Sequence, residues 1–135
     1  MVDINVIRKI LASLNESMEQ LKAKKAVAFD EYKKDRDIQA IVERRLQTAI
    51  QSCIDIGNHI VSQGEFGSPS EYAEIFQILS EKGIISGVLT DKLIRMVGFR
   101  NVLIHEYRSI IVENVYDILQ NRLSDFYEFS QAVMS

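Results

Sequence analysis

Residues 38–60 read IQAIVERRLQTAIQSCIDIGNHI, and this stretch decides the predicted fold. Its apolar residues recur at spacings of three and four, which places them along one side of a helix. That side carries Ile38, Ile41, Val42, Leu46, Ala49, Ile50, Cys53, Gly57 and Ile60. Asp35 or Asp37 can cap the start of the helix, which should end before the loop at residues 64–67. A long helix with one continuous apolar side indicates a helical bundle.

Two segments around this stretch carry helix signals of their own. A helix is predicted from Asp3, which can serve as its N-cap, to about Ala23, and a short stretch follows at residues 29–34. After the loop, Ser68 offers an N-cap, Pro69 a first helical residue and Glu71 the glutamate three residues after the cap. This pattern predicts a short helix that runs to about residue 82 and stops at Gly83.

The last part of the chain predicts two more helices. Ser86 can cap a fourth helix that runs through Ile104, and a fifth follows through Val115 to Phe129. The 135 residues include one proline and six glycines, and they show no strand pattern and no repeat. The predicted fold is therefore all-α, an up-and-down bundle of four to five helices that occupies residues 1–135 as a single domain.

Composition limits the class of protein. Hydrophobic residues make up 47% and charged residues 26% of the chain, a balance that excludes a disordered protein. A net charge of −3 argues against a surface uniformly suited to nucleic acid, so an RNA site would need a local patch. The single cysteine, Cys53, is expected in the core. Neither a signal peptide nor a membrane span is evident, and we expect a cytoplasmic protein.

Arg100 breaks the apolar pattern of the fourth helix. Leu93, Val97, Ile104 and Tyr107 continue the seam in which this arginine stands. A guanidinium in an apolar seam is costly unless it is paired or faces a site for an anion. At about 100° per residue, Tyr107 would lie about 20° from Arg100 around the helix.

Asn101 and His105 lie four residues apart on the adjoining side, so Arg100, Asn101, His105 and Tyr107 would share one broad face. These residue types suit RNA cleavage without a metal. A histidine can move protons on and off a ribose 2′-hydroxyl and a leaving 5′-oxygen, while an arginine stabilises charge on the phosphate. Asn101 would orient His105, and Tyr107 would donate a hydrogen bond to a phosphate oxygen. The face therefore predicts a ribonuclease site.

The run at residues 96–107, MVGFRNVLIHEY, resembles the signature of the HepT branch of the HEPN superfamily. The shared features are Arg100 and His105 in the spacing Arg-x4-His, Asn101 directly after the arginine and Tyr107 two residues after the histidine. The order of the predicted helices also fits, so the resemblance covers nearly the whole chain. It implies an all-helical, HEPN-like toxin of a toxin–antitoxin pair that acts as an endoribonuclease without a metal or cofactor.

The resemblance also implies partners. A homodimer would bring the motifs of both protomers into one cleft with the RNA substrate. The cognate antitoxin would be a minimal nucleotidyltransferase of the MNT type, which silences the toxin by attaching AMP to the motif tyrosine, here Tyr107. Asp55 and His59 resemble polar positions often present in this family. They are candidates for supporting the site from the long helix.

Each of these residues has a structural alternative. Arg100 could be satisfied by a carboxylate such as Asp55, and His105 could cap the helix end. Tyr107 could belong to the core, and Asn101 could be a surface amide. Asp55 and His59, four residues apart, could form a surface ion pair.

A few other features also leave alternatives open. Gly98 indicates close approach by another helix, supplied either by a second chain or by the rest of the bundle. The basic cluster formed by Lys22, Lys24, Lys25, Lys33, Lys34 and Arg36 is either a solvated surface or an RNA path. The alternative function is a non-catalytic helical subunit that binds nucleotide or docks a nucleotidyltransferase.

Overall fold

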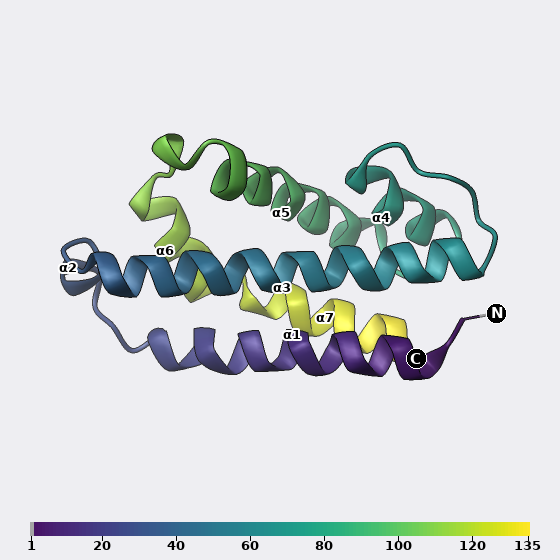
Figure 1. Ribbon diagram of the computed structural model, residues 1–135, viewed down its shortest axis with the longest axis horizontal. Coiled ribbons are helices and arrows are strands. Elements are labelled where there is room, and N and C mark those ends of the chain that lie inside the picture. Colours follow the sequence, from purple (N-terminus) through teal and green to yellow (C-terminus); the bar gives the residue numbers. More distant parts are fainter. Residues whose placement is uncertain (1) are drawn as a thin grey trace.

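Helix α3 (Arg36–Gln63) is the longest element, and the other long helices lie along it (Figure 1). The computed structural model describes residues 2–135. Of the two candidate caps, Asp35 is the one used: its carboxylate accepts hydrogen bonds from the backbone N–H groups of Asp37 and Ile38 at 3.0 and 3.1 Å. The helix ends at Gln63, before the loop at residues 64–67, as predicted.

Helix α1 (Ile4–Lys24) runs antiparallel to α3 and packs along it (Figure 1). The Asp3 carboxylate accepts the N–H of Asn5 at 2.9 Å, which confirms the predicted N-cap. Between the two helices, the hydroxyl groups of Ser17 and Thr48 form a hydrogen bond of 2.9 Å. The single-turn helix α2 (Phe29–Tyr32) lies in the connection at one end of the bundle. The N-terminal pair of helices thus follows the sequence prediction closely.

Helix α4 (Tyr72–Glu81) begins later than the sequence predicts. The expected start at Ser68 and Pro69 is wrong, because both residues remain in the loop. Instead the N–H and hydroxyl of Ser70 donate to the Glu74 carboxylate at 3.1 and 2.8 Å. These two hydrogen bonds stabilise a start three residues further on, and they lower the pKa of Glu74.

The predicted end of α4 is confirmed. Gly83 has a φ of 73°, a left-handed conformation that favours glycine. Its N–H donates to the carbonyl of Ser80 at 3.0 Å, and the N–H of Ile84 donates to that of Leu79 at 2.9 Å. Helix α5 (Gly87–His105) follows, and the Ser86 hydroxyl accepts the N–H of Leu89 at 3.1 Å, as expected for its N-cap.

The segment after α5 was expected to form one helix, and this expectation is wrong. The 3₁₀ turn η1 (Tyr107–Ser109) precedes two separate helices, α6 (Val112–Asn121) and α7 (Leu123–Met134). The break falls at Arg122, whose φ of −119° and ψ of 1° are not helical. The bend lets α6 pack against α1 and α3 while α7 packs against α3 and α5. The free energy gained by burying apolar side chains on both segments therefore exceeds the cost of interrupting one helix.

The fold class is confirmed as all-α. Every regular element within residues 2–135 is helical, and the buried apolar side chains form one cluster. Cys53 is 1% exposed, and burial raises the pKa of its thiol. Across the same residues, the helices are too short or too polar to span a bilayer.

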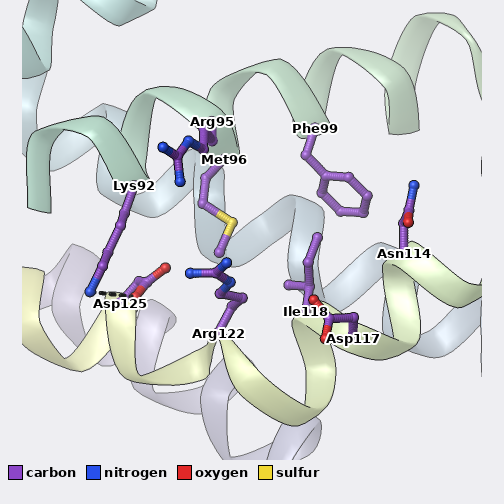
Figure 2. A pocket seen from close by; sticks show the side chains of 9 residues that line it. All are labelled: Lys92, Arg95, Met96, Phe99, Asn114, Asp117, Ile118, Arg122 and Asp125. Carbon is purple, nitrogen blue, oxygen red and sulfur yellow. Dashed lines mark ion pairs between the residues drawn. The ribbon is translucent and has the colours of Figure 1, made fainter.

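A buried carboxylate links α5 to α7 beside a cavity of about 280 Å³ (Figure 2). Lys92 Nζ lies 3.8 Å from Asp125 Oδ1 and 3.8 Å from Glu128 Oε1, and the Asp125 side chain is only 3% exposed. Burial raises the pKa of Asp125, although Lys92 and Arg122 act in the opposite direction. The folded state therefore holds the proton of this carboxyl more tightly than the unfolded chain does.

The raised pKa of Asp125 leads to a prediction about how the stability of the protein depends on pH. As pH rises through the range between the ordinary and the raised pKa of Asp125, the folded protein loses stability from this group. The Asp125→Asn variant lacks the titration, so its free energy of unfolding should rise relative to wild type over that range. Urea unfolding of both proteins from acid to neutral pH measures the difference. If the free energy of unfolding of Asp125→Asn fell relative to that of the wild type as pH increased, the pKa of Asp125 would be lowered in the folded protein instead.

Candidate active site

Helix α5 ends at His105, so the motif is divided between a helix and a turn. Glu106 has φ −132° and ψ 41° and leaves the helix, and the 3₁₀ turn then places Tyr107 outside it with a 66% exposed side chain. The predicted placement of Tyr107 about 20° from Arg100 is wrong, and so is its alternative placement in the core. Three residues after Tyr107, Ile110 packs against the core.

Arg100 is half-buried, and its side chain turns toward α3 and α4. Its Nε donates a hydrogen bond of 2.9 Å to Oε1 of Gln51, and its Cζ lies 5.2 Å from the ring centroid of Tyr72. The alternative that Asp55 neutralises Arg100 directly is wrong. Within residues 2–135 no carboxylate forms an ion pair with this arginine, and Asp55 instead accepts a hydrogen bond of 2.8 Å from Gln51 Nε2.

Asn101 and His105 lie on the exposed side of α5, one helical turn apart. His105 is the last residue of the helix, and no hydrogen bond or ion pair to another residue of the described chain holds its imidazole. Asn101 borders an open groove of about 660 Å³ between the start of α4 and α5, together with Tyr72, Val97 and Gly98. Both polar side chains are thus free to meet a ligand at the surface.

Gly98 faces open space. A Cβ built on this residue would meet no heavy atom within 4 Å, so no part of the described chain approaches it closely. By contrast, a Cβ on Gly57 would come within 2.6 Å of Ile75, which shows where α3 and α4 pack tightly. The alternative that the bundle itself supplies the neighbour of Gly98 is therefore wrong.

His59 takes part in a different contact. Its Nε2 accepts a hydrogen bond of 3.2 Å from the backbone N–H of Asp3, which ties the end of α3 to the start of α1. No ion pair joins His59 to Asp55 in the described chain, so the surface-pair alternative is wrong. Among residues 2–135, no three His, Cys, Asp or Glu side chains lie close enough together to hold a metal ion.

Two residues at Arg100, Gln51 and Tyr72, are not predicted from the sequence. Gln51 stands four residues before Asp55, a spacing that predicts their hydrogen bond, but nothing local links either residue to Arg100. Tyr72 begins α4, which the sequence places earlier. Only the packing of α3, α4 and α5 brings these side chains together.

The cavity beside Lys92 and Asp125 lies on another side of α5. Phe99 lines it, and at about 100° per residue this side chain points about 160° away from Asn101. None of Arg100, Asn101, His105 and Tyr107 borders this cavity (Figure 2). Arg100 and Asn101 thus lie beside the start of α4, whereas His105 and Tyr107 lie at the end of α5 and in the turn after it.

Comparison with known proteins identifies the family. Residues 14–133 match the family described as "Ribonuclease HepT-like". The mRNA nuclease HepT of Shewanella oneidensis is 34% identical over 103 residues, which cover 76% of this chain and 77% of that protein. The tRNA nuclease HepT of Aphanizomenon flos-aquae is 29% identical over 121 residues, which cover 90% of this chain and 82% of that protein.

A solved structure agrees with both the fold and the relationship. The tri-AMPylated Shewanella oneidensis HEPN toxin, solved in complex with MNT antitoxin, superposes with a TM-score of 0.89 at 29% identity. The superposition covers 96% of this chain and 96% of that one. The family match runs from the middle of α1 into α7 and includes every motif residue. The chain therefore belongs to the HepT-like ribonuclease family.

Proposed function

We propose that the chain is the toxin of a toxin–antitoxin pair and cleaves RNA without a metal, using Arg100 and His105. The observation that carries the proposal is a half-buried arginine without a carboxylate partner, close in sequence to an exposed histidine at the end of the same helix. An arginine that lacks an internal counter-charge is suited to an external anion, and RNA supplies one in its phosphate.

In the proposed reaction, His105 accepts the proton of a ribose 2′-hydroxyl. The 2′-oxygen forms a bond to phosphorus while the bond to the 5′-oxygen breaks, and the His105 imidazolium returns its proton to the leaving oxygen. The products are a 2′,3′-cyclic phosphate and a 5′-hydroxyl. Arg100 stabilises the charge on the phosphate in the transition state. Asn101, one turn before His105 on the exposed side of α5, orients the imidazole or the RNA.

The proposed substrate is a cellular RNA in the cytoplasm, of the mRNA or tRNA class on which the two relatives are named to act. The proposed state is a homodimer in which α5 meets a second copy at Gly98. Open space at this glycine and the groove beside Asn101 support that arrangement, because glycine allows backbones to approach closely. Such a contact would place two motifs next to one cleft.

Tyr107 is the proposed control point, that is, the residue through which the antitoxin inhibits the toxin. Its side chain is 66% exposed and lies outside the helix, where a second protein can reach the hydroxyl. The related Shewanella toxin is AMPylated in its complex with MNT antitoxin. We place the corresponding modification of this chain on Tyr107, by a cognate nucleotidyltransferase antitoxin. Before modification, the same hydroxyl can donate a hydrogen bond to an RNA phosphate.

The first test removes the two catalytic side chains. Arg100→Ala should lower the cleavage rate by about 10²–10³-fold and His105→Ala by about 10²–10⁴-fold, because each removes transition-state stabilisation or proton transfer. Purified proteins are incubated with total RNA in EDTA, and fragment ends are sequenced. Arg8→Ala, a substitution on α1 outside the motif, is the matched control that should cleave normally.

The outcome distinguishes a ribonuclease from a non-catalytic subunit that only docks a partner. If a folded Arg100→Ala or His105→Ala protein cleaves at the wild-type rate, the proposed mechanism is wrong. If the wild-type protein itself leaves RNA intact and its expression does not arrest growth, the chain acts as a non-catalytic subunit.

The second test places a side chain where the dimer contact is proposed. Gly98→Leu should raise the stability of the isolated chain by up to about 1 kcal/mol, because leucine favours helix more than glycine does. The same side chain should weaken dimerisation, measured by analytical ultracentrifugation. Gly87→Leu, at another open position of α5, is the control. Unchanged dimerisation of the Gly98 variant would place the interface elsewhere.

The third test concerns the control point. Intact-mass and peptide mass spectrometry of the chain coexpressed with its nucleotidyltransferase should show added AMP on Tyr107. Tyr107→Phe should carry no AMP, because the accepting oxygen is gone. Complete neutralisation of a toxin with unmodified Tyr107 would support steric inhibition instead.

A further inference from the structure

Four polar side chains from three helices form a continuous chain of contacts that ends on Arg100. Asp55 and Gln51 come from α3, Tyr72 from the start of α4, and Arg100 from α5. The contacts are Asp55 Oδ1 to Gln51 Nε2 at 2.8 Å, Gln51 Oε1 to Arg100 Nε at 2.9 Å, and the Tyr72 ring centroid to Arg100 Cζ at 5.2 Å. Three of these residues lie outside the motif and far from it in sequence.

Asp55 decides which way the Gln51 amide points. A carboxylate only accepts hydrogen bonds, so the amide must turn its NH₂ group toward Asp55. Its oxygen then faces Arg100, where it accepts the N–H of Nε. The opposite orientation would place an NH₂ group against a guanidinium, which only donates. The amide is therefore held in one orientation by groups on both sides.

The same contacts decide which guanidinium nitrogens of Arg100 remain available to bind a phosphate. Nε is occupied by Gln51, while no other side chain of the described residues forms a hydrogen bond or ion pair with the two terminal nitrogens. The guanidinium carbon of Arg100 lies over the Tyr72 ring, 5.2 Å from its centroid, so the face of the ring attracts the cation. The terminal nitrogens are the pair that binds two phosphate oxygens side by side.

We propose that Gln51 and Tyr72 are positioning residues of the ribonuclease site and that Asp55 acts through Gln51. They hold the Arg100 guanidinium so that its free edge meets the scissile phosphate. The inference rests on the proposed catalytic role of Arg100. It adds two residues on which the reaction depends, neither of which touches the substrate in this role.

The test replaces the Gln51 acceptor. Gln51→Leu keeps the approximate size of the side chain but removes the oxygen, and it should lower the single-turnover rate at saturating RNA by roughly tenfold or more. Gln51→Glu keeps an acceptor for Nε but pairs a carboxylate with Arg100, so its rate should also fall, because the charge of the arginine is no longer available for the phosphate. Gln47→Leu, one turn earlier on α3, is the matched control and should cleave as wild type.

Tyr72 is tested in the same assay. Tyr72→Phe keeps the ring against Arg100 and should retain the rate, whereas Tyr72→Leu removes the aromatic face and should lower it several-fold. A loss in both variants would assign the effect to the phenol hydroxyl and overturn the positioning role of the ring.

A second readout does not depend on cleavage. The Nε proton of Arg100, observed by NMR in ¹⁵N-labelled protein, should exchange slowly with water in the wild type and in Gln51→Glu. It should exchange much faster in Gln51→Leu. Equal exchange in all three proteins would mean that the hydrogen bond is absent in solution and would overturn the inference.

The activities of the variants separate this inference from the proposed function. If Arg100→Ala cleaves at the wild-type rate, the proposed mechanism is wrong. If Arg100→Ala is inactive while a folded Gln51→Leu cleaves at full rate, the mechanism stands and the positioning role of Gln51 is wrong. Thermal unfolding of each variant checks that a lower cleavage rate is not caused by loss of the folded structure.

Discussion

The burial of helix α3 is the constraint on which the rest of the structure depends. Its apolar side must be removed from water, and α1, α4, α5, α6 and α7 all pack against it. At Gly57 the approach is so close that a Cβ would collide with Ile75 of α4. The same packing that buries the apolar side also sets α4 and α5 beside the polar positions of α3.

Arg100 illustrates how this packing produces a site. The guanidinium is half-buried between α3 and α4, where a lone charge would be costly, and an amide and an aromatic ring lower that cost without cancelling the charge. A carboxylate at the position of Gln51 would pair with Arg100 directly. Asp55 is linked to Arg100 only through Gln51, so the arginine keeps its positive charge available for an anion.

Local signals predict much of the fold. Asp3, Asp35 and Ser86 cap their helices because a side-chain oxygen next to a free backbone N–H decides the start within a few residues. Gly83 ends α4 because few other residues adopt its backbone conformation. The start of α4 and the break at Arg122 were mispredicted. The start of α4 follows the hydrogen bonds from Ser70 to Glu74, and the break at Arg122 lets α6 and α7 pack against different helices.

The sequence by itself determined the all-helical class, most helix boundaries, and the residue types of the motif around Arg100, because periodicity and capping act within one or two turns. Tertiary structure alone decided that Tyr107 leaves the helix, that Gly98 faces open space, and that Gln51 and Tyr72 contact Arg100. These features arise where separate helices meet. Residues 51, 72 and 100 become neighbours only after the apolar side of α3 has been covered.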